Sequence, residues 1–235
     1  MTPGKLYLIP NIIAENTQDS VIPLQVKDTL QRLRNFLVED VRTARRYLSS
    51  LKIYASIEPL QFQVLNKDTA REELPGLMAP LLNGLDIGVI SESGCPGVAD
   101  PGAMAVHYAH NHGIAVIPLT GPSSILMALM ASGLNGQKFA FQGYLPVDSQ
   151  TALKTIKEYE RESKQKGQTQ IFIETPYRNN AVFGFLLNGL HSSTQLTVAL
   201  DITGPHQQIQ TKTIADWKTS AVHWPKSPAV FLFLA

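Results

Sequence analysis

The chain has 235 residues, 44% of them hydrophobic, and it carries 20 Lys and Arg residues against 19 Asp and Glu residues. This length allows one large or two small domains with a real core, and the near-neutral charge excludes the broad basic field of a typical nucleic-acid-binding protein. A single cysteine, Cys95, excludes an internal disulfide and a cysteine-rich zinc site. With no apolar run near the roughly 20 residues of a membrane span and no signal-peptide pattern, we expect a cytoplasmic protein without a membrane contact.

Strand and helix patterns alternate along the first half of the chain. Apolar runs typical of buried strands cover residues 5–10, 36–40, 62–66, 86–91 and 114–121. Helical patterns lie between them, over residues 21–36, 41–51, 70–85 and 102–113. This alternation predicts a largely parallel sheet with helices on both faces.

The second half repeats this class of structure without repeating the sequence. Helical patterns cover residues 123–133, 153–167 and 179–190, with a further helix-like stretch that ends near Trp217. Strand patterns cover residues 138–146, 169–175, 196–203 and 229–235. We therefore predict an α/β protein with two domains, residues 1–120 and 121–235, which meet near Gly121 and Pro122.

The stretch "SESGCPGVADPG" directly follows the strand pattern "IGVI". Ligands of open parallel sheets bind beyond the carboxyl ends of the strands, and Gly94 and Gly97 allow a ligand to approach the backbone closely. A second loop, "PLTGPSSI", follows the next strand and carries Ser123 and Ser124. Both loops also have the composition of any connection from a strand to a helix, and neither fits a Walker A or G-x-G-x-x-G sequence.

Six segments, in order along nearly the whole chain, resemble one known group of enzymes. They are "GKLYLIPN", "FLVEDVRTARRYL", "ISESGCPGVADPG", "GIAVIPLTGPSSILMALMASGLNGQKFAFQGYLP", "QIFIETPYRNN" and "SPAVFLFLA". The sequence resembles the tetrapyrrole methylase superfamily, and within it most closely the ribosomal RNA branch, small-subunit methyltransferase I. Several ordered matches are much more specific than one motif.

The resemblance implies two α/β domains with mostly parallel sheets and a crevice for S-adenosylmethionine between them, in a homodimer. It implies 2′-O-methylation of a cytidine ribose in small-subunit (16S) ribosomal RNA, without a metal. The loop after "IGVI" is then expected to hold the methyl donor through backbone groups more than side chains. Carried over by position, the expected cofactor-binding residues are Pro10, Ser93, Gly94, Cys95, Pro96, Val98, Ser123, Ser124, Ile173, Glu174, Leu200 and Ala229.

A ribose hydroxyl is a poor nucleophile while protonated, so a carboxylate base would accelerate its methylation by about 10²–10⁴-fold. Asp100 also has the position of a helix cap, and Glu39 and Asp40 could instead pair with the nearby arginines. No single carboxylate is preferred on sequence alone. The catalytic candidates are Glu39, Asp40, Asp100 and Asp201, with Glu92 and Glu174 as further carboxylates at predicted strand ends.

The sequence departs from the ribosomal RNA branch at two places that bear on function. Ala14 stands where a glycine is usual in the first loop, and "ALDITG" stands where the branch usually carries Ala-Arg-Glu-Leu-Thr-Lys. Two alternatives therefore stay open. One is a methyltransferase for a tetrapyrrole or other small molecule, which the near-neutral charge favours. The other is a cofactor-binding homologue without catalysis, which the missing arginine and lysine favour.

Two clusters of side chains have both a functional and an ordinary interpretation. Arg42, Arg45, Arg46 and Lys52 form the best local basic patch, which would contact RNA phosphates or simply pair with Glu39 and Asp40. The histidines of "HYAHNH" have the one-turn spacing of metal ligands, but they have no acidic neighbour and are more typical of a solvated helix face.

Overall fold

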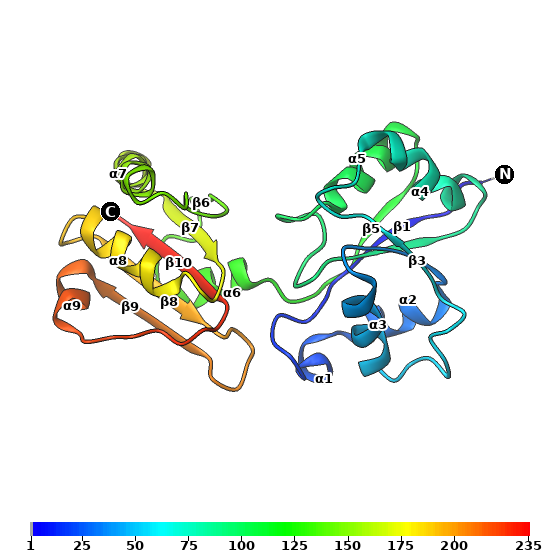
Figure 1. Cartoon of the computed structure of the whole chain (residues 1–235), viewed down its shortest axis with the longest axis horizontal. Coiled ribbons are helices and arrows are strands. Elements are labelled where there is room, and N and C mark those ends of the chain that lie inside the picture. Colours follow the sequence, from blue (N-terminus) through cyan, green and yellow to red (C-terminus); the bar gives the residue numbers. More distant parts are fainter. Residues whose placement is uncertain (1) are drawn as a thin grey trace. The chain divides into compact units, whose positions relative to one another are not determined.

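The computed structural model describes residues 2–235. The chain divides into two compact units, Met1–Ser123 (unit 1) and Ser124–Ala235 (unit 2) (Figure 1). Each unit contains one five-stranded sheet with helices, and this confirms the predicted α/β class. No helix within the described residues has the length and apolar content needed to cross a membrane.

Unit 1 is built on a sheet in which every neighbouring pair of strands is parallel, in the order β3–β2–β4–β1–β5. The carboxyl ends of all five strands therefore lie at one edge. The strands are β1 (Leu6–Ile9), β2 (Asn35–Val38), β3 (Gln61–Val64), β4 (Ile87–Ile90) and β5 (Val116–Pro118). The helices are α1 (Gln18–Val21), α2 (Leu24–Arg32), α3 (Val41–Ser50), the 3₁₀ turn η1 (Arg71–Glu73), α4 (Leu74–Leu82) and α5 (Gly102–Asn111).

Helices cover both faces of the sheet of unit 1. Apolar side chains of α2 and α3, such as Leu30 and Leu48, pack on one face against Phe36 of β2. Those of α4 and α5, such as Met78 and Ala105, pack on the other face. All four residues of β4 are buried, because this central strand is covered on both sides. The predicted parallel sheet is thus found in this unit.

Unit 2 has a mixed sheet in the order β6–β7–β10–β8–β9. Only β6 and β7 are parallel, and the other three pairs are antiparallel. The strands are β6 (Phe139–Phe141), β7 (Thr169–Glu174), β8 (Gln195–Leu200), β9 (Gln208–Thr213) and β10 (Ala229–Leu234). The helices are α6 (Ser124–Ser132), α7 (Ser149–Lys166), α8 (Asn179–Gly189) and α9 (Ile214–Thr219).

The strand directions of unit 2 differ from the largely parallel sheet that alternation suggested. Strand β10 inserts between β7 and β8 and runs opposite to both. Strand β9 was not predicted, because its sequence "QIQTKT" is polar and lies at the sheet edge, where an apolar pattern is not required. A pattern of buried residues identifies a strand but not its direction.

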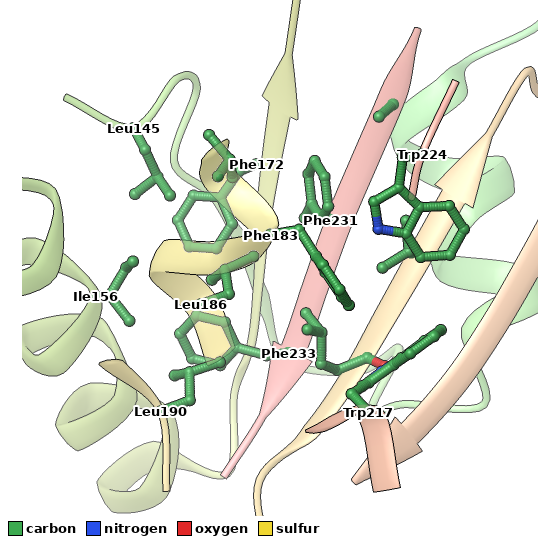
Figure 2. Close-up of a cluster of buried hydrophobic side chains, with 14 of the residues drawn as sticks. Leu145, Ile156, Phe172, Phe183, Leu186, Leu190, Trp217, Trp224, Phe231 and Phe233 are labelled. Carbon is green, nitrogen blue, oxygen red and sulfur yellow. The ribbon is translucent and has the colours of Figure 1, made fainter. Parts of the chain in front are cut away.

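The core of unit 2 contains a group of three aromatic side chains in perpendicular contact. Phe183 of α8 meets Trp217 of α9 and Trp224 edge-on, with ring centroids 5.4 Å apart in both pairs (Figure 2). Such edge-to-face pairs contribute about 0.5–1.5 kcal/mol each beyond the burial of their area. This packing holds Trp224, in the segment that leads into β10, against α8. Strand β10 begins with Ala229, one of the predicted site residues of unit 2.

Candidate functional site

The loop that follows β4 is held in a compact turn by one carboxylate. Asp100 Oδ1 accepts hydrogen bonds from the backbone N–H of Gly97 at 2.8 Å and of Gly102 at 2.6 Å. Gly94 and Gly97 take left-handed φ values of 67° and 83°, which glycine adopts without steric cost. Ala99 takes φ 58° without that freedom, so the loop stores some strain.

Asn11 joins the loop after β1 to the loop after β4. Its side chain is 2% exposed, and its Nδ2 donates to the carbonyls of Ser91 at 2.9 Å and Glu92 at 3.1 Å. Its backbone N–H donates to the carbonyl of Gly94 at 2.8 Å. Sequence reasoning missed this residue, and its signal was a polar side chain directly after a buried strand.

Pro10 is fixed from two sides. The hydroxyl of Tyr47 donates to the Pro10 carbonyl at 2.8 Å, and burial raises the pKa of Tyr47, so the hydroxyl keeps its proton. Gly121 lies so close that a Cβ on it would stand 2.1 Å from Pro10 Cβ. The glycine of "PLTGPSSI" is therefore required by contact with the first loop.

The loops after β4 and β5 meet at Cys95. Its thiol donates to the carbonyl of Pro122 at 3.4 Å, which brings the loop after β4 against the loop after β5. Burial, together with the charge of Asp100, raises the pKa of Cys95, so the thiol stays protonated and is a poor nucleophile.

A cavity of about 770 Å³ lies at this edge of unit 1 and is markedly acidic. Its walls come from the ends of β2 and β4, the segment after β3 and the start of α5. Lys67 is the one basic residue among its lining residues. The carboxylates that line it are Glu39, Asp40, Asp68, Glu92 and Asp100.

The carboxylates of this cavity are not alike in their proton affinity. Burial raises the pKa of Glu39, and the charges of Asp100 and Glu92 raise it further, against the lowering effect of a 3.1 Å hydrogen bond from the N–H of Glu92. Burial also raises the pKa of Asp100, against the two backbone hydrogen bonds that it accepts. The pKa of Asp40 is lowered by the 2.7 Å hydrogen bond from Thr43 N–H that caps α3.

In unit 2 the predicted cofactor-binding residues lie in one row across the sheet. Ala229, which begins β10, stands in register with Glu174 on one side and Leu200 on the other. Ile173 adjoins Glu174 and donates its N–H to the carbonyl of Gly143 at 2.9 Å. The antiparallel insertion of β10 thus places its start beside the ends of β7 and β8.

The Glu174 carboxylate is buried and bonded to neighbouring residues of unit 2. It is 1% exposed, with Oε2 3.1 Å from Arg178 Nη1, and its Oε1 accepts from the N–H of Thr175 at 2.7 Å. A ligand at this position would meet backbone groups of Glu174 rather than its carboxylate. Arg178 was not predicted, because Glu174 ends β7 and Arg178 is the N-cap of α8, so no helical spacing relates the two.

The comparison with curated proteins gives matches along most of the chain. A ribosomal RNA small subunit methyltransferase I from Mesorhizobium japonicum is 32% identical over 209 residues, which are 89% of this chain and 67% of that protein. This chain belongs to the ribosomal RNA small subunit methyltransferase I family. The proteins of that name from Vibrio cholerae and Halalkalibacterium halodurans are 29% and 28% identical over 90% and 97% of this chain, covering 69% and 73% of their own lengths.

No protein-family model matches the chain. Among solved structures, the methyltransferase CobJ has a TM-score of 0.63 at 17% identity, covering 98% of this chain and 94% of that one. The uroporphyrin-III C-methyltransferase of Thermus thermophilus, solved with S-adenosylhomocysteine, has a TM-score of 0.57 at 16% identity, covering 98% and 97%. At these identities the likeness concerns the fold, which is that of tetrapyrrole methyltransferases.

Asp201 belongs to unit 2 and is not among the residues that line the acidic cavity of unit 1. It has φ 48°, and its Oδ2 accepts from the backbone N–H of His206 at 2.8 Å, which closes the turn after β8. Thr203, with φ 70°, makes the same turn strained, since a β-branched residue rarely adopts this region. The segment "ALDITG", where the sequence departs from the family, thus enters a turn that is closed by hydrogen bonds between its own residues.

The arginines of α3 do not pair with Glu39 and Asp40 as one interpretation expected. Arg45 lies 2.5 Å from Glu58, and Arg46 lies 3.9 Å from Glu15. Arg42 is exposed and is a minor cause of the lowered pKa of Asp40. The acidic cavity therefore keeps its carboxylates largely free of ion pairs.

The histidines of α5 make local contacts. His112 Nδ1 lies 2.9 Å from the carbonyl of Tyr108, and its ring stacks on that tyrosine with centroids 3.9 Å apart. His107 Nε2 lies 3.1 Å from Asn111 Nδ2. Within residues 2–235, no group of three or more His, Cys, Asp or Glu side chains has an arrangement that would hold a metal ion.

Proposed function

We propose that this chain is an S-adenosylmethionine-dependent methyltransferase that methylates the 2′-hydroxyl of a cytidine in small-subunit ribosomal RNA. The observation that carries the proposal is the match, over 89% of the chain, to a ribosomal RNA small subunit methyltransferase I. The solved relative with bound S-adenosylhomocysteine, the demethylated donor, supports the choice of cofactor. The small-molecule alternative has only fold-level likeness on its side.

The loop after β4 fits an S-adenosylmethionine molecule. The carbonyls of Gly94 and Cys95 and the side chains of Cys95 and Asp100 are used in contacts that shape the loop. The amide N–H groups of Gly94 and Cys95 make none of the hydrogen bonds found within residues 2–235. These amides suit the carboxylate or ribose oxygens of the donor. Val98 is 50% exposed and offers an apolar contact. The remaining predicted residues of unit 1 are Pro10, Ser93, Pro96 and Ser123.

Unit 2 contributes the residues that lie side by side at the ends of β7 and β8 and at the start of β10. Leu200 and Ala229 stand in register, but their side chains are buried in the core of unit 2, so a donor at this place would meet their backbone groups. Ile173 and Glu174 present backbone groups beside them. Ser124, the first residue of α6, completes the set.

When bound, S-adenosylmethionine supplies an electrophilic methyl group on a sulfonium, so the protein has mainly to align the acceptor oxygen and take its proton. We infer that Glu39 takes that proton. It is half-buried, lines the acidic cavity and has a raised pKa, which makes it a stronger base than an ordinary carboxylate.

The other three candidates have structural duties. Asp40 caps α3, and its lowered pKa makes it a weak base. Asp100 Oδ1 accepts two backbone hydrogen bonds, and its Oδ2 is enclosed by protein. Asp201 closes its own turn in unit 2. Asp40 and Asp100 also line the cavity, but each of the three accepts backbone hydrogen bonds that hold a turn or the start of a helix.

Three further parts of the proposal rest on the resemblance. We infer a homodimer, a cytoplasmic location, and the assembled small subunit or its RNA as the partner. We also propose that the two units correspond to the two domains of the family, with the boundary of residues 1–120 and 121–235 placed three residues before that of the compact units.

The test is transfer of labelled methyl from S-adenosylmethionine to small ribosomal subunits purified from cells that lack this gene. Nuclease digestion and mass spectrometry then locate the product. We expect one cytidine methylated on its ribose. Donor binding measured by calorimetry, with no transfer to subunits or free RNA, would contradict the proposal and favour a small-molecule acceptor or a silent binding protein.

A further inference from the structure

Exposed tyrosines gather on unit 2 where α8 begins. Tyr177 is 82% exposed and Tyr144 is 57% exposed, and Val147, three residues after Tyr144, is 80% exposed. Single exposed apolar side chains are ordinary, but a group on adjoining loops is typical of an interaction site. With Lys226, these residues form what we call the tyrosine surface.

The loops that carry the two tyrosines are joined by one guanidinium. Arg178 donates from Nη1 to the carbonyl of Leu145 at 3.3 Å and from Nη2 to that of Pro146 at 3.0 Å. Tyr177 directly precedes Arg178, and Tyr144 directly precedes Leu145. The ion pair with Glu174 fixes the guanidinium in turn.

A third loop brings a cation to the same place. Asn179 Nδ2 donates to the carbonyls of Pro225 at 3.2 Å and Ser227 at 2.7 Å, which flank Lys226. The Nζ of Lys226 lies 5.3 Å from the centroid of the Tyr177 ring. This distance is that of a cation–π contact, so the ring and the positive charge form one unit.

These loops are anchored in the core. Leu145 is 2% exposed and Trp224 is 3% exposed, and both belong to the cluster that includes Phe183 (Figure 2). Asn180 adds hydrogen bonds to both the carbonyl and the N–H of Trp224, at 2.9 and 2.8 Å. The loops that carry the tyrosines are therefore rigid, so little conformational entropy of these loops is lost when a ligand binds.

We propose that the tyrosine surface binds unpaired bases of single-stranded RNA in the substrate. Aromatic rings stack on bases regardless of sequence, and a lysine beside them meets the phosphate chain. The Glu174 carboxylate is paired with Arg178, and Asp148, which is exposed beside Val147, accepts a hydrogen bond from Thr151 as the cap of α7. The inference rests on the proposed function, since it assigns part of the RNA contact to unit 2.

The test is the affinity of the full-length chain for a labelled single-stranded RNA of about ten nucleotides, measured by fluorescence anisotropy. We expect Tyr177→Ala and Tyr144→Ala each to weaken binding about tenfold, because a stacking partner is lost. Tyr177→Phe, which keeps the ring, should bind like the wild type. Leu24→Ala is the matched control, since Leu24 is 75% exposed but lies in unit 1.

The salt dependence gives a second, independent measure. Lys226→Ala should lower the slope of log affinity against log salt concentration by about 0.7, the value for one phosphate contact on a single strand. Tyr177→Phe should leave this slope unchanged. An unchanged slope in Lys226→Ala would remove the lysine from the RNA contact and contradict the proposal.

The inference is wrong if the wild type does not bind the RNA, or if both alanine variants bind it as tightly as the wild type. A change in sedimentation of Tyr177→Ala without a change in RNA affinity would instead assign the surface to a second copy of the chain. Methyl transfer to small subunits is scored separately. Its absence in the wild type overturns the proposed function, whereas its presence with unaltered RNA binding in the variants overturns this inference alone.

Discussion

Unit 1 and unit 2 gather their site residues at a sheet edge by different topologies. In unit 1 all strands are parallel, so five strand-end loops arrive at one edge and are joined directly, as by Asn11 and Tyr47. In unit 2 the start of the antiparallel β10 is inserted between the ends of β7 and β8. The site residues of unit 1 are held in place by direct contacts between loops. Those of unit 2 are held by the ion pair of Glu174 and Arg178, which joins the neighbouring loops.

The largest effect is expected from breaking that pair in unit 2. Arg178→Ala leaves the buried Glu174 carboxylate without its partner, which should lower the free energy of unfolding of this unit by about 3 kcal/mol. Trp217 and Trp224 are the only tryptophans and both lie in unit 2, so their fluorescence in urea reports this unit alone. Adding Glu174→Gln should recover part of the loss. A double variant less stable than Arg178→Ala would contradict the account.

A smaller effect is expected at the close approach in unit 1. Gly121→Ala sets a methyl group 2.1 Å from Pro10 Cβ, so the two loops must separate, at about 1–3 kcal/mol. Hydrogen exchange of peptides from β1 and β4 measures the loss within this unit. Gly184→Ala in α8, where a Cβ meets nothing within 4 Å, is the control and should gain up to about 1 kcal/mol in unit 2. Equal effects of the two substitutions would mean that the contact with Pro10 is not tight.

The smallest effect concerns pH. The folded-state pKa of Glu39 is raised, so its contribution to stability is present below its unfolded value and is lost as pH rises through the raised value. Glu39→Gln should therefore slightly stabilise unit 1 at neutral pH, and the gain should vanish in acid. The pKa of Asp40 is lowered, so its contribution to stability has the opposite pH dependence: it is present at neutral pH and is lost in acid. Asp40→Ala should therefore destabilise this unit at neutral pH and less so in acid. Urea midpoints followed by circular dichroism across pH test both signs.

The sequence predicted what depends on local pattern. The alternation of strands and helices in unit 1, the α/β class and the positions of the loops after β4 and β5 follow from apolar periodicity and from glycine and proline positions. The parallel sheet of unit 1 follows from the helical connections between its strands.

Contacts between distant segments were beyond such reasoning. Asn11 and Ser91 are separated by 80 positions, and nothing local relates them. The direction of β10 and the polar edge strand β9 depend on sheet pairing rather than on residue pattern. In the sequence, Asp201 and Glu39 look alike, because each is a carboxylate that follows a buried strand. The hydrogen bond that Asp201 accepts from His206 N–H identifies it as a turn-forming residue, and this bond is not visible in the sequence.

The most direct test of the account is the single-turnover rate of methyl transfer from S-adenosylmethionine to small ribosomal subunits by three proteins: wild type, Glu39→Gln and Asp201→Asn. We predict that Glu39→Gln loses about 10²–10⁴-fold in rate with unchanged donor binding, while Asp201→Asn stays close to wild type. A Glu39→Gln rate equal to wild type, or a comparable loss in Asp201→Asn, would contradict the assignment of the base to the acidic cavity of unit 1.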